Sequence, residues 1–182
     1  IQEIMSKYKG VPVYIINRTS GYIYGFHSPD TPEVYFDHDY KTVSKPFLNE
    51  FSKYYEQTMC SIAKNNPVYI TTPTPEMPFN IPKEMAKKEM LNNRPYEYDL
   101  DVKKYNTRNA FIRGLMDKVH QKCGVTILNV GPYFCNSEKC ISSINGDSLY
   151  YDDNHLSVFG SRLLSPLFKS TRSNAPLNNN VL

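Results

Sequence analysis

Apolar residues occur along the chain in two patterns, short continuous runs and stripes at helical spacing. Three short runs, rich in β-branched and aromatic residues, cover residues 11–16, 68–72 and 125–130. Polar segments or segments with proline or glycine follow each run. Such bounded runs are typical of buried strands. We therefore expect three strands whose ends lead into loops.

Two apolar stripes with steps of mostly three and four residues lie between these runs. The first comprises Leu48, Phe51, Tyr55, Met59 and Ile62, and the second comprises Val102, Tyr105, Ile112, Met116, Val119 and Cys123. This spacing places the apolar side chains on one face of a helix. Gly124 is placed to end the second helix. Strands that alternate with helices predict an α/β fold with a parallel sheet covered on both faces.

The remaining segments are less regular. Residues 18–44 and 73–94 contain many of the prolines and loop aromatics, so we expect two long connections that serve as lids or binding loops. A last helix is predicted over residues 158–169, interrupted or ended near Pro166. We assign residues 1–169 to one domain and the Ser- and Asn-rich residues 170–182 to a flexible tail.

Composition removes several classes of function. The chain has 182 residues, and its net charge of +3 is too small for a nucleic-acid binder. Its longest strongly apolar run, residues 13–16, is far shorter than the roughly 20 residues of a membrane span. The nucleotide motifs G-x-G-x-x-G and Gly-Lys-Ser/Thr, the G-x-S-x-G elbow and the H-E-x-x-H zinc motif are absent from the sequence.

The four cysteines fall into two kinds of setting. Cys135 and Cys140 enclose a short polar segment that can close as a disulfide loop in an oxidising compartment. Zinc is the rival use of this pair, but the sequence offers no second pair to complete four ligands, so we expect no metal. Cys60 and Cys123 lie near the apolar stripes, where a free thiol acts as a small core residue. We expect these two to be unpaired.

Asp152 and His155 are the candidate catalytic pair. An Asp three residues before a His, in a loop that enters a helix, can place its carboxylate on the imidazole Nδ1–H and leave Nε2 as a general base. Asp153 competes for the same role but has the less suitable spacing. By itself the D-x-x-H spacing is weak evidence and is more typical of a surface turn that caps a helix.

The context of this pair resembles a known family. Residues 150–160, Tyr-Tyr-Asp-Asp-Asn-His-Leu-Ser-Val-Phe-Gly, closely resemble the C-terminal block of the SGNH domains that follow an acyltransferase-3 membrane domain in bacterial O-acetyltransferases. Residues 11–20 resemble the third block, residues 68–78 resemble a strand with its Pro-Glu loop, and Cys135 and Cys140 stand where these domains carry a cysteine pair. The resemblance covers about residues 1–168 and implies an SGNH-hydrolase (flavodoxin-like) three-layer α/β/α fold with a parallel sheet.

The family pattern implies roles for particular residues. His155 would be the general base and Asp152 its orienting carboxylate. Asn17, with Arg18 as second choice, would hold the oxyanion, and a polar cap or ion pair at the strand end is the alternative. The pattern departs here from the usual Gly-x-Asn-Asp, because Ile15-Ile16-Asn17-Arg18 stands in its place.

The main departure from the family pattern concerns the nucleophile. It is a serine in a Gly-Asp-Ser motif after the first strand, whereas the Gly-Asp-Ser of this chain, residues 146–148, lies shortly before His155 and follows no apolar strand. A nucleophile needs a rigid mount. We therefore expect Ser148 not to be the nucleophile and residues 145–148 to form a turn. We expect the first strand and its serine to precede Ile1.

The resemblance implies the extracytoplasmic SGNH part of a membrane-bound O-acetyltransferase on the periplasmic side of the bacterial inner membrane. Such an enzyme transfers an acetyl group, through a serine ester, to a hydroxyl of lipopolysaccharide O-antigen or another cell-surface polysaccharide. It implies a transmembrane acyltransferase-3 domain in the same polypeptide and acetyl-CoA as the ultimate donor, with no cofactor on this domain. A stand-alone carbohydrate esterase and a non-catalytic glycan-binding module are the alternatives. We expect the chain by itself to be inactive.

Overall fold

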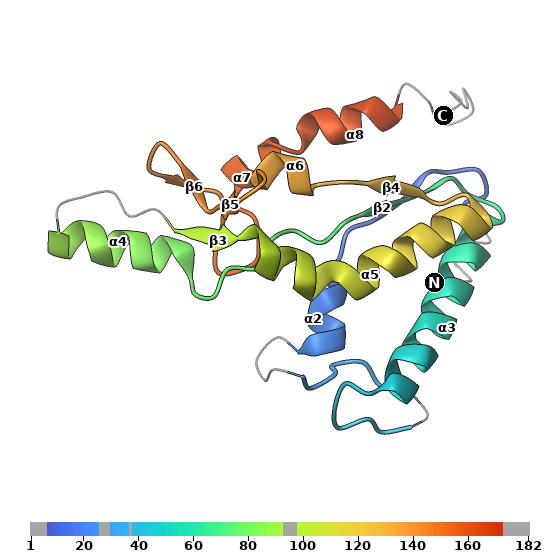
Figure 1. Cartoon of the computed structure of the whole chain (residues 1–182). Coiled ribbons are helices and arrows are strands. Elements are labelled where there is room, and N and C mark those ends of the chain that lie inside the picture. Colours follow the sequence, from blue (N-terminus) through green and yellow to red (C-terminus); the bar gives the residue numbers. More distant parts are fainter. Residues whose placement is uncertain (1–6, 26–29, 37, 93–97, 173–182) are drawn as a thin grey trace. The chain divides into compact units, whose positions relative to one another are not determined.

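The computed structural model describes residues 7–25, 30–36, 38–92 and 98–172. They form two compact units (Figure 1). The first comprises Ile1–Pro73 and Asn106–Asn129, and the second comprises Thr74–Tyr105 and Val130–Leu182. In the described residues no helix is both long and apolar enough to cross a membrane.

A three-stranded parallel sheet forms the centre of the first unit. Its strands are β1 (Val13–Ile15), β2 (Val68–Thr71) and β4 (Thr126–Leu128), in the order β1-β2-β4. Val13 is in register with Val68, and Tyr69 with Thr126. The three predicted strands are thus confirmed with shorter bounds. All four residues of the middle strand β2 are buried, as its continuous apolar pattern requires.

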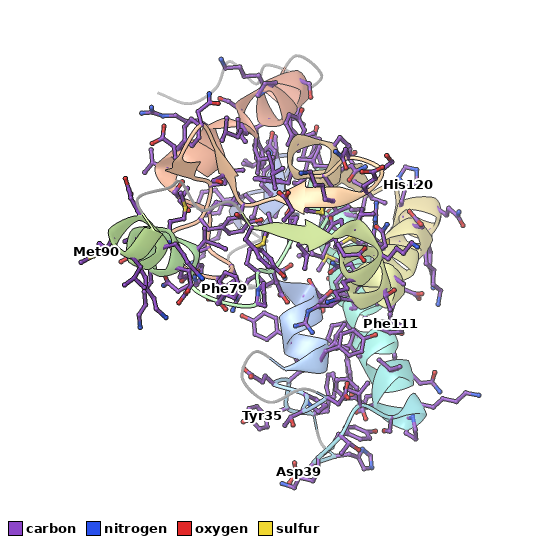
Figure 2. The ribbon with its side chains drawn as sticks, turned by 60° about the vertical axis from the view of Figure 1, so that its left-hand side comes forward. Tyr35, Asp39, Phe79, Met90, Phe111 and His120 are labelled. Carbon is purple, nitrogen blue, oxygen red and sulfur yellow. A yellow bond between two sulfur atoms is a disulfide. The ribbon has the colours of Figure 1, made fainter. Side chains whose placement is uncertain are left out.

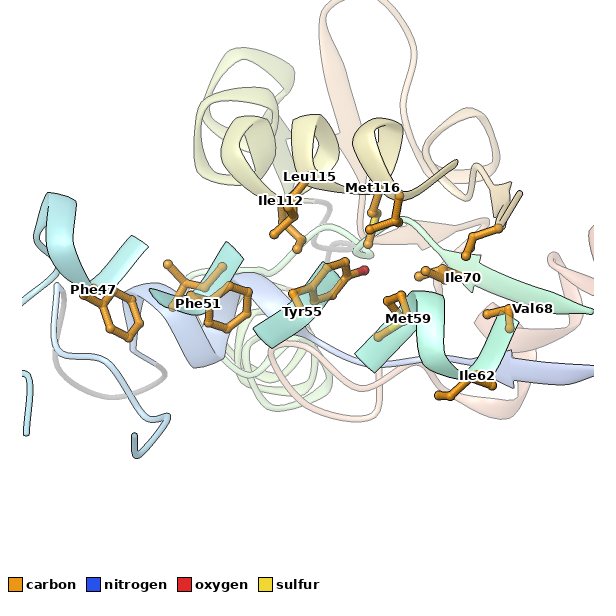
Figure 3. Close-up of a cluster of buried hydrophobic side chains, with 13 residues drawn as sticks. Phe47, Phe51, Tyr55, Met59, Ile62, Val68, Ile70, Ile112, Leu115 and Met116 are labelled. Atoms are coloured by element: carbon orange, nitrogen blue, oxygen red, sulfur yellow. The ribbon is translucent and has the colours of Figure 1, made fainter. Parts of the chain in front are cut away.

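Two long helices pack onto this sheet and bury their predicted stripes. They are α3 (Lys45–Ala63) and α5 (Val102–Cys123), and α5 passes from the second unit into the first. Figure 3 shows side chains of α3 directed toward Ile112 and Met116 of α5 and Ile70 of β2. Gly124 ends α5 as predicted, since its φ of 71° is left-handed and its N–H donates to the carbonyl of His120 at 3.0 Å.

The prediction of free thiols at Cys60 and Cys123 is wrong. These residues form a disulfide with a Cα–Cα distance of 5.3 Å, which joins α3 to the last turn of α5. Each cysteine does lie beside an apolar stripe, but the two helices pack against the same sheet and bring the thiols together. Periodicity places each cysteine on a helix face and carries no information about its partner 63 residues away.

The segment over residues 18–44 contains one helix that the sequence analysis missed. It is α2 (Thr19–Tyr24), which follows β1 almost directly. Its first residues, Thr19 and Ser20, are buried. The proline and glycine content of this segment obscured the short helix because the helix has no apolar stripe long enough to recognise.

The second unit has its own core and its own small sheets. Helix α4 (Ile81–Asn92) lies in the Pro-rich segment that we expected to be irregular. Strands β3 (Asp99–Asp101) and β5 (Lys139–Ile141) pair antiparallel, as do β6 (Ser143–Ile144) and β7 (Asp147–Ser148). The short helix α6 (Gly131–Phe134) precedes β5. Phe134, Leu149 and Tyr150 are almost fully buried in this core.

The last predicted helix is two helices. They are α7 (Val158–Arg162) and α8 (Ser165–Arg172), and the break falls just before Pro166. Pro166 occupies the first turn of α8, where a missing N–H is harmless. Helix α8 extends past the expected domain end at residue 169 into the segment that we predicted to be a tail. The rest of that segment, residues 173–182, lies outside the described residues.

Candidate active site

Asp152 and His155 form a hydrogen-bonded pair in the second unit. The Nδ1 atom of His155 lies 2.7 Å from Oδ2 of Asp152. The Asp152 side chain is 25% exposed and the His155 side chain is 65% exposed. The carboxylate is therefore partly shielded, while the imidazole is open to an incoming reactant.

The second carboxylate oxygen fixes the loop around this pair. Oδ1 of Asp152 accepts hydrogen bonds from the backbone N–H groups of Asn154 at 2.8 Å and His155 at 2.7 Å. Partial burial, the largest effect, raises the pKa of Asp152, but the bond from the Asn154 N–H and the bonds from the side chain and backbone of His155 outweigh it. The net result is a pKa below the ordinary 3.8.

An ionised Asp152 determines the tautomer of His155. A carboxylate only accepts hydrogen bonds, so the proton of the neutral imidazole lies on Nδ1. The lone pair is then on Nε2, where it can take a proton from a hydroxyl group. Asp153 was the other candidate for orienting His155. Its Oδ1 instead accepts a hydrogen bond from the side-chain amide of Asn154 at 2.7 Å. The expected pairing with Asp152 rather than Asp153 is what the structure contains.

Backbone hydrogen bonds anchor the His155 loop to the core of the second unit. The N–H of Tyr151 donates to the carbonyl of His155 at 2.7 Å, and the N–H of Ser157 donates to the carbonyl of Leu149 at 2.9 Å. Tyr150 and Leu156 form an isolated antiparallel bridge. Both ends of the loop are thus tied to the buried residues Leu149 and Tyr150.

Ser157 and Gly160 complete this anchor, although the sequence analysis gave them no role. The hydroxyl of Ser157 donates to the carbonyl of Ser148 at 2.8 Å and accepts from the N–H of Gly160 at 3.0 Å, which caps α7. A Cβ on Gly160 would lie 2.0 Å from the carbonyl oxygen of Leu149. Serine is a preferred N-cap residue, but the contacts with the carbonyl groups of Ser148 and Leu149 leave no signal in the sequence.

The Pro-Glu loop and the start of α4 also hold the His155 loop. The N–H of Met77 donates to the carbonyl of Asp153 at 2.7 Å, and the N–H of Ile81 donates to the carbonyl of Asp152 at 3.2 Å. Met77 and Ile81 are themselves buried. The segment resembling the family's Pro-Glu loop therefore holds the backbone of Asp152 and Asp153 in place.

Ser148 lies in a β-hairpin. The two-residue turn between β6 and β7 has left-handed φ angles at Asn145 (53°) and Gly146 (86°), as expected for an Asn-Gly hairpin turn. The hydroxyl of Ser148 donates to the carbonyl of Tyr150 at 2.8 Å and accepts from its N–H at 3.1 Å. The turn predicted over residues 145–148 is confirmed at Asn145 and Gly146, while Asp147 and Ser148 form strand β7 of the hairpin.

Asn17 and Arg18 lie in the first unit, at the carboxyl end of β1. The side chain of Asn17 is exposed, and its Oδ1 accepts a hydrogen bond from the hydroxyl of Thr19 at 2.7 Å. Arg18 occupies the N-cap position of α2, and its side chain forms no capping hydrogen bond. The structure thus pairs Asp152 with His155 in one unit and places the two oxyanion candidates in the other.

Cys135 and Cys140 form the predicted disulfide, with a Cα–Cα distance of 3.9 Å. The two residues also form an isolated antiparallel bridge, and Cys140 is buried in strand β5. The residue two positions further on, Ser142, accepts a hydrogen bond from the N–H of Leu149. Among the described residues no group of three or more His, Cys, Asp or Glu side chains is arranged to hold a metal.

Comparison with known proteins gives two matches. A family model described as SGNH domain (fused to AT3 domains) matches residues 1–170. The solved periplasmic domain of the lipopolysaccharide acetyltransferase of Salmonella ser. Paratyphi A is similar, with a TM-score of 0.53 and 14% identity over 90% of this chain and 83% of that chain. No curated protein matches the chain. At this identity the structural similarity shows the fold, and the mixed α/β fold with a parallel sheet is confirmed.

Proposed function

The chain belongs to the family of SGNH domains fused to AT3 domains, and on this basis we propose that it is the extracytoplasmic part of a membrane-bound O-acetyltransferase. The fusion that defines the family supports an acyltransferase-3 domain in the same polypeptide. The similar solved domain is described as periplasmic and as part of a lipopolysaccharide acetyltransferase, which supports the same side of the inner membrane for this chain.

The Asp152–His155 geometry is the observation that carries the proposal. In the first half-reaction, the hydroxyl oxygen of a serine attacks the acetyl carbonyl while Nε2 of His155 takes the hydroxyl proton. The donor's leaving group departs with that proton, and an acetyl-serine ester remains. In the second half-reaction, an acceptor hydroxyl attacks the ester, His155 takes its proton, and the proton returns to the serine oxygen.

The serine in this mechanism comes from a segment that precedes residue 1 in the full-length protein. Two observations support this assignment. The family places its nucleophile after a first strand, and the hydroxyl of Ser148 already makes two hydrogen bonds to the backbone of Tyr150 in a hairpin. Asn17 is the proposed oxyanion donor, because it lies at the carboxyl end of a parallel strand, where sites of open α/β sheets form. Arg18 is the second candidate for that role.

The acceptor that we propose is a hydroxyl group of lipopolysaccharide O-antigen or another cell-surface polysaccharide. Acetyl-CoA is the proposed ultimate donor, and the membrane domain relays the acetyl group across the bilayer. The SGNH part then needs no bound cofactor, because His155, Asp152 and a serine suffice for acyl transfer.

The test is glycan acetylation by the full-length protein in its membrane. His155→Ala is expected to lower the rate by ~10²–10⁴, the usual cost of losing a general base. His38→Ala is the matched control, since His38 is also exposed and lies 3.5 Å from a carboxylate, that of Glu50. Asp152→Asn is expected to be severe as well, whereas Asp153→Asn is expected to retain more activity.

The same assay separates the alternatives. Undiminished acetylation in the His155→Ala strain overturns the catalytic assignment. Acetate release from acetylated glycan without any net transfer identifies an esterase that uses the same residues. Glycan binding that persists in all variants, together with no acetyl turnover, identifies a binding module.

A further inference from the structure

The hydrogen bond between Thr19 and Asn17 fixes the orientation of an exposed amide. Oγ1 of Thr19 donates to Oδ1 of Asn17 at 2.7 Å. Thr19 is 2% exposed, while the side chain of Asn17 is exposed at the end of β1. Within the described part of the chain, this is the one hydrogen bond that the side chain of Asn17 makes.

The direction of this bond determines which end of the amide is available. The terminal torsion of an Asn side chain is broad and roughly two-fold, so an amide without a partner exposes its oxygen or its nitrogen with similar ease. The reversed amide would place Nδ2 beside the Thr19 hydroxyl and leave a buried hydroxyl hydrogen without an acceptor, which is unfavourable. Thr19 therefore holds Oδ1 inward, and the two N–H groups of Nδ2 remain for an external acceptor.

The position of Thr19 is itself fixed by buried polar contacts. The neighbouring hydroxyl of Ser20 donates to Oδ1 of Asn109 on α5 at 2.6 Å, and both side chains are buried. The N–H of Gly21 donates to the carbonyl of Arg18 at 2.9 Å, which closes the first turn of α2. The start of α2 is thus fastened to α5, which fixes the backbone of Thr19, and turning the buried hydroxyl away from Asn17 would break its hydrogen bond.

We infer that Thr19 is a positioning residue for the oxyanion site, acting by holding the amide of Asn17 with its N–H groups outward. This inference rests on the proposed function, in which Nδ2 of Asn17 stabilises the negative oxygen of the acyl-transfer intermediates. An oxyanion donor helps only if it is oriented before the charge develops. Thr19 supplies that orientation without contacting the reacting atoms.

The test compares variants of the full-length membrane protein in the glycan acetylation assay. Thr19→Val keeps the shape and removes the hydroxyl, and we expect a roughly tenfold lower kcat with an unchanged KM for the acceptor, less than the ~10²–10³ lost with a whole oxyanion donor. Thr19→Ser keeps the hydroxyl and is expected to restore the rate. Thr171→Val is the matched control, because Thr171 is a buried threonine whose hydroxyl donates to the carbonyl of Phe168.

The decisive measurement is the double variant. If Thr19 acts through Asn17, Thr19→Val causes no further loss in the Asn17→Ala protein. An equal further loss there, or a Thr19→Ser protein as slow as Thr19→Val, overturns the inference and indicates a structural role. If Asn17→Ala is fully active while His155→Ala is inactive, acetyl transfer through His155 stands, whereas the proposed role of Asn17 and this inference both fail. If His155→Ala is fully active, the proposed function itself fails. Membrane protein levels and melting temperatures identify any variant that does not fold.

Discussion

At the scale of single residues, the His155 loop is a rigid element built from a few hydrogen bonds. One carboxylate, that of Asp152, serves two functions, since Oδ1 closes the turn and Oδ2 holds the imidazole. The spacing of Asp152 and His155 was visible in the sequence. The part played by Ser157 and Gly160 was not, because it depends on the carbonyl groups of Ser148 and Leu149, which run beside them.

The lowered pKa of Asp152 predicts how this turn responds to acid. Because the folded-state pKa lies below the unfolded value of 3.8, ionised Asp152 stabilises the fold above pH 3.8, and this contribution is lost as the pH falls through the folded pKa. We expect the stability difference between wild type and Asp152→Asn to shrink as the pH falls below 3.8. Thermal unfolding at a series of pH values measures this. A difference that grows in acid would contradict the assignment.

Replacing Gly160 by alanine is expected to destabilise the fold, because there is no room for the added methyl group. Gly160→Ala places a Cβ 2.0 Å from the carbonyl oxygen of Leu149, so the backbone must move. We expect the free energy of unfolding to fall by ~3 kcal/mol, at the upper end of overpacking costs. Acetylation should fall too, because the same carbonyl accepts the N–H of Ser157 at the end of the His155 loop.

Gly114→Ala provides the matched control for this substitution. Gly114 lies inside α5, and no atom lies within 4 Å of an added Cβ. Alanine is favoured over glycine in a helix by up to ~1 kcal/mol, so this variant is expected to be slightly more stable. Denaturant unfolding of both variants tests the pair. Equal stability changes in the two proteins would show that contact with Leu149 is unimportant.

At the scale of elements, apolar patterns predicted the helices and strands whose apolar residues form a continuous run or line one face. The strands at residues 13–15, 68–71 and 126–128 and the helices α3 and α5 follow directly from such patterns. Helix α4 could not be found in this way, because it carries few buried residues and its Met90 is 87% exposed (Figure 2). The β6–β7 hairpin is only two residues long on each side, so its Asn-Gly turn was the one available signal.

The two disulfides differ in what they are expected to contribute. Cys60–Cys123 closes a loop of 63 residues and Cys135–Cys140 a loop of five. On the chain-entropy model these correspond to about 4 and about 2 kcal/mol of stabilisation. We expect Cys60→Ser with Cys123→Ser to lower the free energy of unfolding more than Cys135→Ser with Cys140→Ser. Denaturant unfolding of the 182-residue chain compares the two double variants, and the reverse order would show that local geometry outweighs loop length.

At the scale of the whole molecule, the chain divides in a way that composition does not reveal. It leaves the first unit after Pro73 and returns at Asn106, inside the continuous helix α5 and near its start. No proline or glycine marks that boundary, because both sides of it are the same helix. The sequence therefore indicated one domain of alternating strands and helices, while the packed structure has two separate cores.

The last prediction concerns the nucleophile, which requires the whole protein. Acyl transfer needs a serine, a base and an oxyanion donor that converge on one reacting carbonyl, and a hairpin serine with both hydrogen-bonding functions engaged does not meet this need. We expect the 182-residue chain alone to be inert toward a serine-directed phosphonate. A longer chain that carries the proposed upstream serine should be labelled.

Ser148→Ala distinguishes the two serines in this experiment. In the part of the chain that the structure describes, the Ser148 hydroxyl bonds only to the backbone of Tyr150, so its loss should lower stability by roughly 1 kcal/mol and leave the labelling of the longer protein unchanged. His155→Ala in the same protein should abolish labelling, since the serine then has no base. Labelling of Ser148 itself in the short chain would identify the hairpin serine as the nucleophile, and the mechanism would then have to operate within the second unit alone.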